Sequence, residues 1–210
     1  TAHRLELASD YITECHALKG VLKADMENIR STMEKIDYNT FEDVVNNIFT
    51  AKRIYIIGLR SSMALAEFLG FYLNIILQNV KTVGYGISDI FEQMINVGEG
   101  DLVIGIGFPR YASRTIDALA FAQDRGATVV AVTDSFLSPL ATRADYALIA
   151  QSNMASFVDS LVAPLSVINA LIIAVGMREK ENISSTFNSL EEIWQEYNVY
   201  SYNNRNVGDD

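Results

Sequence analysis

A quarter of the way along the chain lies Arg53-Ile54-Tyr55-Ile56-Ile57-Gly58, an unbroken run of β-branched and aromatic residues that ends in a glycine. The run shows no alternation of polar and apolar positions. A strand of this composition is typically buried on both faces, as in a parallel sheet that is covered by helices. We therefore predict a strand here, inside a parallel sheet.

Downstream of this strand, helical and extended patterns alternate. Short apolar runs predict four more strands, at Val80–Val83, Leu102–Ile106, Thr128–Val132 and Tyr146–Ala150. The segments between and after them predict helices at Ser62–Leu77, Asp89–Val97, Ser113–Arg125, Ser156–Met177 and Ser184–Tyr197, with a helical turn near Ser138–Thr142. Parallel strands need crossover connections, and those connections are right-handed. The alternation therefore predicts an α/β protein with helices on both faces of a parallel sheet.

Two helices are expected before the first strand. Apolar residues recur at steps of three and four between Leu5 and Ile36, which predicts one long amphipathic helix. The segment Asp37-Tyr38-Asn39-Thr40 interrupts this pattern. Because Thr40 is followed by an acid three places later, it resembles a helix start, and we expect a short helix from Thr40 to Ala51.

The composition suits one compact domain with an appendage. The chain has 210 residues, of which 50% are hydrophobic and 20% are charged. Its 26 Asp and Glu against 16 Lys and Arg give a net charge of −10, and no segment gathers basic residues into a cationic face. The chain alone is therefore a poor candidate for nucleic-acid binding.

The single cysteine, Cys15, excludes an internal disulfide and zinc sites built on paired cysteines, so we expect a reducing cytoplasm. The opening segment Thr1–Lys23 has no apolar core of the kind a signal peptide needs, and we expect the chain to be a fragment of a longer protein. The segment Ser160–Met177 is uncharged and long enough to suggest a membrane span. Because Asp159 and Arg178 flank it closely and polar residues lie inside it, we expect a helix buried in the core or in a subunit interface instead.

The loop after the first strand, Gly58-Leu59-Arg60-Ser61-Ser62, contains groups suited to an anion. Ligands of open parallel sheets bind beyond the carboxyl ends of the strands, where this loop lies. Ser61 and Ser62 stand at a helix N-terminus, where backbone N–H groups and hydroxyls favour an anion. The alternative interpretation is that one serine only caps the helix.

Two further loops have similar content. Gly107-Phe108-Pro109-Arg110-Tyr111-Ala112-Ser113-Arg114-Thr115 also leads into a helix. Arg110 could contact a carboxylate or a phosphate and Tyr111 a sugar, although Arg110 could equally lie in solvent. The third loop, Thr133-Asp134-Ser135, adds more hydroxyls, and Ser138 just beyond it is expected to cap a helical turn.

Catalytic groups are sparse. The two histidines, His3 and His16, lie in the N-terminal helical region near Cys15, and adjacent residues of a helix point in different directions. Glu67 and Glu92 are candidate bases, but no sequence partner marks either of them. We therefore expect no catalytic residue.

No cofactor or metal is expected either. The dinucleotide fingerprint G-x-G-x-x-G and a phosphate-loop lysine are both absent, which disfavours nucleotides. Asp159 either complements the dipole of the apolar helix or contacts a ligand. The sequence leaves open whether Asp159 or Glu92 does so.

Taken together, these segments resemble a known family. Gly58-Leu59-Arg60-Ser61-Ser62, Gly107-Phe108-Pro109-Arg110-Tyr111 and Thr133-Asp134-Ser135, with Ser138-Pro139-Leu140-Ala141 and Ala144-Asp145, resemble the sugar isomerase (SIS) domain of RpiR-type (MurR/RpiR family) bacterial transcriptional regulators. The likeness covers about residues 20–200, and the Phe-Pro-Arg-Tyr loop is a mark of one branch. It implies a three-layer α/β sandwich with a five-stranded parallel sheet of order 2-1-3-4-5, flavodoxin-like, with additional N-terminal and C-terminal helices.

The resemblance also implies a domain organisation. Residues 1–19 correspond to a connector from an upstream helix-turn-helix domain, residues 20–200 to the SIS domain and residues 201–210 to a flexible tail. Because the helix-turn-helix domain is missing here, DNA is expected to be contacted only through it. The resemblance implies a domain that dimerises. The uncharged segment Ser160–Met177 and the apolar face near Leu18–Met33 also offer more apolar surface than one small sheet can cover, so we expect a homodimer or tetramer and no membrane partner.

The sequence departs from the family pattern in both phosphate-binding loops. Many SIS domains have Gly-x-Gly-Ser after the first strand, where Arg60 replaces the second glycine, and Ser-x-Ser-Gly-x-Thr after the third, where Gly107 replaces the first serine. A phosphate is still expected to suit Ser61, Ser62 and Thr115. A carboxylated or otherwise acidic metabolite would suit Arg60 and Arg110 equally well.

We therefore expect an effector-sensing and dimerisation domain of a bacterial transcriptional regulator, without catalytic activity. Its ligand is expected to be a phosphosugar or a related anionic carbohydrate-derived metabolite. The candidate ligand-binding residues are Arg60, Ser61, Ser62, Gly107, Arg110, Tyr111, Ser113, Thr115, Thr133 and Asp134. The alternative is a sugar-phosphate aldose–ketose isomerase on the same fold, which would need a carbon-acid base and a ring-opening acid.

Overall fold

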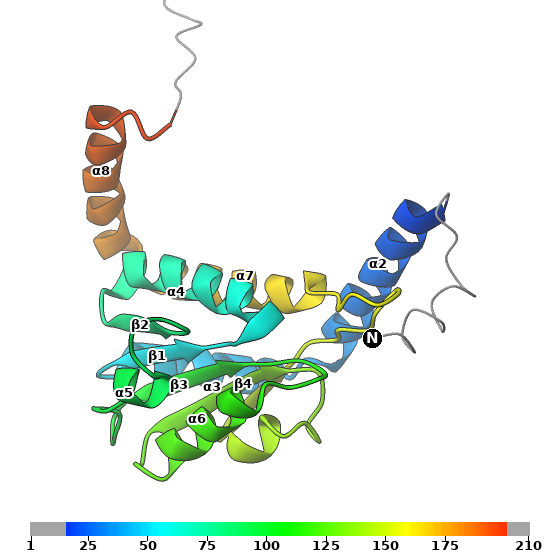
Figure 1. Ribbon diagram of the computed structural model, residues 1–210. Helices are drawn as coiled ribbons and strands as arrows, with labels where there is room; N and C mark the ends of the chain where they lie inside the picture. Colours follow the sequence, from blue (N-terminus) through cyan, green and yellow to red (C-terminus); the bar gives the residue numbers. More distant parts are fainter. Residues whose placement is uncertain (1–15, 201–210) are drawn as a thin grey trace, which may run out of the picture.

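The computed structural model describes residues 16–200 and contains one five-stranded parallel sheet. The strands are β1 (Ile54–Ile57), β2 (Val80–Val83), β3 (Leu102–Ile106), β4 (Thr128–Thr133) and β5 (Tyr146–Ile149). Their order is β2-β1-β3-β4-β5, and every neighbouring pair is parallel (Figure 1). The α/β class and the strand order are both confirmed.

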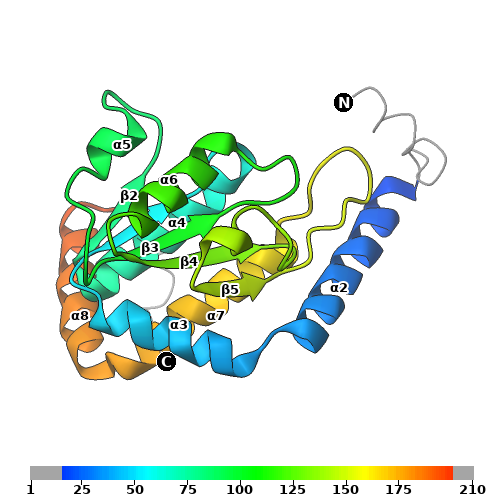
Figure 2. The same cartoon turned by 90° about the horizontal axis from the view of Figure 1, so that it is seen from below.

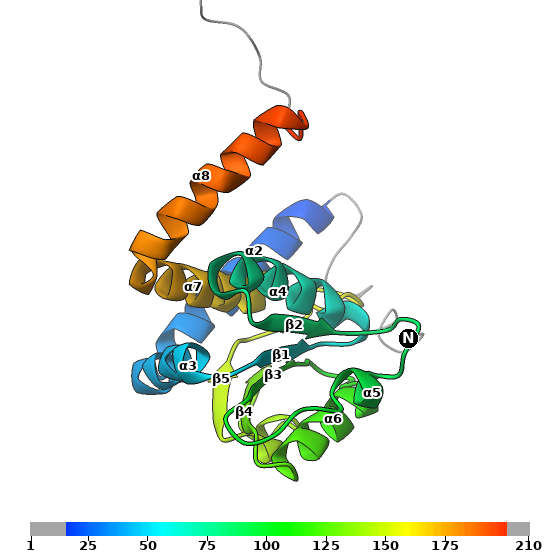
Figure 3. The ribbon, with the colours of Figure 1, turned by 90° about the vertical axis from the view of Figure 1, so that its left-hand side faces the viewer.

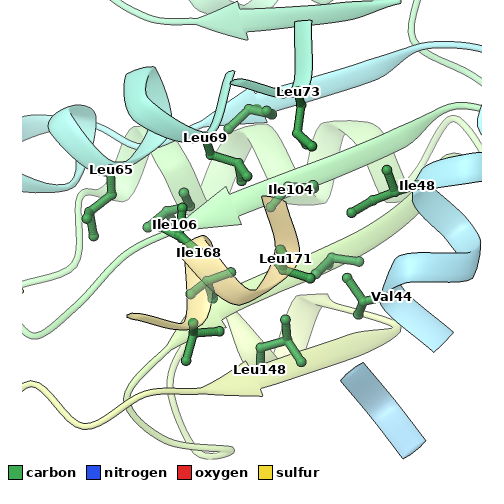
Figure 4. Packing of buried hydrophobic residues seen from close by; sticks show 14 of the residues in the cluster. Val44, Ile48, Leu65, Leu69, Leu73, Ile104, Ile106, Leu148, Ile168 and Leu171 are labelled. Carbon is green, nitrogen blue, oxygen red and sulfur yellow. The ribbon is translucent and has the colours of Figure 1, made fainter. Parts of the chain in front are cut away.

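Helices cover the two faces of this sheet in separate layers. One face packs against α3 (Tyr38–Thr50), α4 (Met63–Leu77) and α7 (Val162–Arg178), and the other against α5 (Ile90–Gln93), α6 (Ser113–Gln123) and the short η3 turn (Ala141–Arg143). Figure 4 shows the first of these cores, in which side chains of α4 and α7 pack on β3 and β5.

Alternate residues of the buried strands point to opposite layers. Ile54 and Ile56 belong to the core under α4 and α7, whereas Tyr55 and Ile57 belong to the core under α6. All four are buried, as the unbroken apolar run predicts.

Several helix boundaries differ from the predicted ones. The helix α3 begins at Tyr38, and its N-cap is Asp37, whose carboxylate accepts the Thr40 N–H at 2.9 Å, so the expected start at Thr40 is wrong. The helix α5 ends after one turn at Gln93 rather than at Val97. The helix α7 begins at Val162 rather than at Ser156, which leaves Asp159 in the loop after β5.

The apolar helix α7 is buried on one side rather than all round. Val167, Ile168, Leu171 and Val175 are in the core, but Ile173 is 61% exposed. Within residues 16–200, no single helix combines the length and hydropathy needed to cross a membrane. Only α7 and α8 (Lys180–Glu196) taken together are long and apolar enough, and these two helices are bent by 108° relative to each other.

Two helices extend beyond the sandwich. The helix α2 (Ala17–Lys35) lies at one end of the molecule and α8 at the other, as Figures 1 and 2 both show. The predicted N-terminal helix is present from Ala17 onwards. Its earlier part, most of the expected connector at residues 1–19 and the expected tail at residues 201–210 lie outside the described residues.

Candidate functional site

A pocket of about 370 Å³ opens beyond the carboxyl ends of β1 and β3. That volume suits a small metabolite. Both predicted loops contribute to its wall, because β1 and β3 are neighbours in the sheet and their ends share one edge. Eight of the expected residues line it: Arg60, Ser61, Ser62, Gly107, Arg110, Tyr111, Ser113 and Thr115.

The first loop turns sharply at Gly58. A Cβ atom at this position would lie 2.7 Å from the carbonyl oxygen of Ser62, so only glycine fits. The chain then enters the η2 turn (Arg60–Ser62) and α4 directly. Although Ser62 occupies the N-cap position of α4 and is 4% exposed, its side chain makes no capping hydrogen bond. The interpretation that Ser62 only caps the helix is therefore not supported.

The second loop presents another helix start without a side-chain cap. The helix α6 begins at Ser113, and no carboxylate lies in its first turn. Thr115, in this turn, is completely buried, and its Oγ1 atom has no hydrogen-bond partner among the described residues. A buried hydroxyl without a partner costs about 1–3 kcal/mol, so a ligand that forms a hydrogen bond with this group would gain affinity from it.

Both arginines of the pocket have an unusual backbone conformation. Arg60 has a φ of 61° and Arg110 a φ of 49°, in the left-handed region that favours glycine. A residue with a side chain costs about 1–2 kcal/mol there. Strain of this kind is concentrated at binding sites, where it places a side chain that the chemistry needs.

The third loop does not line the pocket but contacts Tyr111, which does. The Tyr111 hydroxyl donates to Asp134 Oδ1 at 2.7 Å, and Thr133 Oγ1 donates to the same atom at 3.2 Å. Burial and this hydrogen bond raise the pKa of Tyr111 well above its ordinary value, which keeps the phenol protonated. Thr133 and Asp134 are not among the residues that line this pocket, and Asp134 holds Tyr111 in place; contact of either with a ligand stays a prediction.

Of the remaining candidate residues, Asp159 lies at the pocket, whereas Glu92, Glu67 and Ser138 do not line it. Asp159 lines the pocket from the loop between β5 and α7. Glu92 lies elsewhere, in a capping box in which its carboxylate accepts the Asp89 N–H at 2.9 Å. Glu67 is not among the lining residues, and Ser138 Oγ accepts the Ala141 N–H at 3.1 Å, as expected of a cap.

A family model of the SIS domain matches residues 47–174. The chain belongs to the SIS domain family. Over 182 residues this SIS domain is 28% identical to an uncharacterised HTH-type transcriptional regulator of Haemophilus influenzae, covering 85% of this chain. The chain spans 62% of the length of that relative.

Two solved structures share the fold of this SIS domain. The sugar isomerase domain of an RpiR transcription factor from Sphaerobacter thermophilus has a TM-score of 0.80 and 30% identity, covering 84% of this chain and 99% of that one. The NanR protein of Vibrio vulnificus, complexed with ManNAc-6P, has a TM-score of 0.74 and 19% identity, covering 95% of this chain and 76% of that one.

The loop that carries Asp159 connects the pocket of this SIS domain to α2. The Asn28 side chain donates to the Asn153 carbonyl at 2.8 Å and accepts the Asn153 N–H at 3.1 Å. Ser160, next to Asp159, donates to Asp25 at 2.7 Å. Because Asn28 is 1% exposed, its two hydrogen bonds to Asn153 are shielded from water.

Proposed function

We propose that the chain is the effector-binding domain of a transcriptional regulator and that its effector is a phosphorylated sugar or a related anionic carbohydrate derivative. The observation that carries this proposal is the pocket itself. Two helix starts without capping side chains face the same cavity as Arg60, Arg110 and the orphan hydroxyl of Thr115. Each of these groups favours an anion.

The likeness to known proteins supports the regulatory role. The Haemophilus influenzae relative is named an HTH-type regulator, and the Vibrio vulnificus protein of the same fold binds a phosphorylated sugar. Because the net charge is −10, DNA contact is assigned to a helix-turn-helix module outside this chain. The proposed setting is the cytoplasm, where DNA and sugar metabolites are both present.

Catalysis is the less favoured role, because the pocket offers few acid–base groups. An aldose–ketose isomerase needs a base at the carbon and an acid that opens the sugar ring. His16 is not among the lining residues, and Tyr111 is held protonated against Asp134. Asp159 is the one carboxylate among the residues that line the described pocket.

Effector binding is proposed to reach α2 through the loop that carries Asp159. Contacts between a ligand and Asp159 would pull on the neighbouring Ser160, which is hydrogen-bonded to Asp25 of α2. Asn28 and Thr32 fix the same loop at two further points, the second through the Gln151 N–H at 2.8 Å. A ligand that prefers one loop position therefore shifts the position of α2.

Calorimetric titration with sugar phosphates and their dephosphorylated counterparts tests the proposal. Phosphorylated sugars should bind, and Thr115→Val should weaken binding about 5- to 10-fold because it removes one hydroxyl contact while keeping the shape of the side chain. Thr50→Val, at an exposed helix end, is the matched control and should bind normally. Equal binding of dephosphorylated sugars, or an unchanged affinity of Thr115→Val, would contradict the assignment.

A further inference from the structure

The pocket has a buried part that offers hydrogen-bond donors without a charged side chain. Ser62 and Thr115, which we call the floor, line the pocket and are 4% and 0% exposed. They lie at the N-termini of α4 and α6, neither of which has an acid in its first turn. The two helices cover opposite faces of the sheet (Figure 3), so two helix N-termini reach the same pocket from different sides. Hydroxyls and free N–H groups in this arrangement suit one small anion.

The outer part of the pocket is charged instead. Arg60 and Arg110, which we call the rim, line the same pocket but are both exposed. Within residues 16–200, neither of these arginines forms an ion pair or a side-chain hydrogen bond. In contrast, Arg114, which does not line the pocket, is paired with Asp89. The two guanidinium groups of the rim are therefore available to a ligand.

The backbone of both rim residues has a conformation that the helices do not require. Gln78 and Asn198 also have a positive φ, but they lie at the C-terminal ends of α4 and α8, where a left-handed residue commonly ends a helix. Arg60 and Arg110 lie in the loops after β1 and β3, so no helix end accounts for their φ values of 61° and 49°. Glycine would adopt this conformation without strain. Two strained arginines in one pocket indicate that their side chains serve a ligand.

A single phosphate does not need both the floor and the rim. The phosphate of a sugar phosphate has three terminal oxygens that accept hydrogen bonds. The floor supplies two hydroxyls and the first N–H groups of two helices, and Ser61 and Ser113 add further hydroxyls to the pocket wall. These donors are sufficient for one phosphate without the arginines. The charge of the rim therefore suits a second acidic group on the same ligand.

Asp159 limits how much negative charge this second group can carry. It is the one carboxylate among the described residues that line the pocket, and beside two arginines it leaves one positive charge in excess. A carboxylate brings one negative charge, whereas a second phosphate brings about two. The charge balance therefore favours a carboxylate over a second phosphate. Asp159 itself can accept hydrogen bonds from hydroxyls of a sugar chain.

We propose that the effector is a phosphorylated sugar acid, with its phosphate at the floor and its carboxylate at the rim. The forked guanidinium groups of Arg60 and Arg110 match the two oxygens of a carboxylate. The pocket volume of about 370 Å³ suits a ligand that extends from the floor to the rim. This inference rests on the proposed function and narrows the class of effector that the pocket binds.

Calorimetric titration of the full chain with matched pairs of ligands tests the inference. Each pair consists of an aldonate phosphate, of pentose or hexose length, and the corresponding alditol phosphate, which has a hydroxymethyl group in place of the carboxylate. At least one aldonate phosphate should bind roughly tenfold or more tightly than its partner, because the carboxylate adds a charge-assisted contact.

The outcomes separate this inference from the proposed function. Equal affinities within every pair would overturn the inference and leave a phosphosugar effector in place, as would tighter binding of an alditol bisphosphate than of any aldonate phosphate. An aldonate without phosphate that binds as tightly as its phosphate would contradict the proposed function but not the role of the rim. Binding by none of the phosphates would contradict both.

A variant of the rim shows which group of the ligand the arginines contact. Arg110→Gln removes the charge, and Gln78 shows that glutamine adopts a positive φ in this fold. The preference for the aldonate phosphate over the alditol phosphate should fall roughly fivefold or more. Arg143→Gln, at an exposed arginine that does not line the pocket, is the matched control and should keep the preference. If Arg110→Gln weakens both ligands of a pair equally, the guanidinium contacts the phosphate and the inference is wrong.

Discussion

Arg110→Gly should stabilise the fold and weaken effector binding at the same time. With a φ of 49°, Arg110 holds a left-handed conformation that costs a residue with a side chain about 1–2 kcal/mol. Glycine adopts it freely, but loses more freedom on folding, which offsets roughly 0.4–1 kcal/mol. The expected net gain is about 0.5–1 kcal/mol, or roughly 1–4 °C in Tm for a chain of this length.

The loss of binding is expected to be larger than the gain in stability. A charge-assisted hydrogen bond from Arg110 to an anionic effector contributes about 1.5–3 kcal/mol. Removing the guanidinium should therefore weaken binding by roughly 10- to 150-fold. A gain in stability together with a loss of affinity would show that the strained backbone of Arg110 is maintained for ligand binding.

Thermal unfolding and calorimetry on the same variants measure both quantities. Gln78→Gly is the matched control, because Gln78 also has a positive φ, of 60°, but lies at the end of α4, away from the pocket. This control should gain similar stability and bind the effector normally. The reasoning is refuted if Arg110→Gly lowers the Tm, or if it leaves the affinity unchanged.

Three further predictions concern the groups that support the pocket. Asp134→Asn should weaken effector binding about 3- to 10-fold by calorimetry, because Tyr111 loses its charged acceptor. In an ultraviolet pH titration Tyr111 should ionise at a higher pH than an ordinary tyrosine, because its pKa is raised. The stability that this hydrogen bond provides should be fully present below the usual tyrosine pKa of about 10, and it should be lost as the pH rises from there through the raised pKa. Asn28→Ala should weaken effector binding about fivefold although Asn28 lies outside the pocket, because the freed loop must be ordered again on binding. Glu34→Ala, on the exposed side of α2, is the control and should leave the affinity unchanged. Equal effects of the two variants would argue against the connection through the loop.

The sheet and the position of the pocket could be predicted because the signals are local. The strands β1 and β3 are continuous apolar runs, and such runs have few alternatives to burial inside a parallel sheet. Once these two strands are neighbours, the loops after them must share an edge, which brings Ser62 and Thr115 into one pocket.

Features that depend on tertiary context were not predictable in the same way. Phe157 and Val158 extend the apolar pattern of α7 towards the N-terminus, which hid the loop that brings Asp159 to the pocket. The sequence did offer one signal for this position: Asp159 follows the last strand, and loops after the strands lie at the edge of the sheet where the pocket opens. The periodicity of α2 located its apolar side, but the buried side is the one with Asn28 and Thr32, because hydrogen bonds to a distant loop decide how the helix lies.

The most direct test of the proposed function is phosphorus NMR of sugar phosphates mixed with the full chain at equal concentration. If the pocket binds a phosphorylated effector without converting it, the phosphorus resonance of at least one sugar phosphate should shift or broaden, and no new resonance should appear with time. The growth of a new resonance would show an isomerase. A spectrum unchanged for every sugar phosphate would contradict the assignment of the pocket to this class of effector.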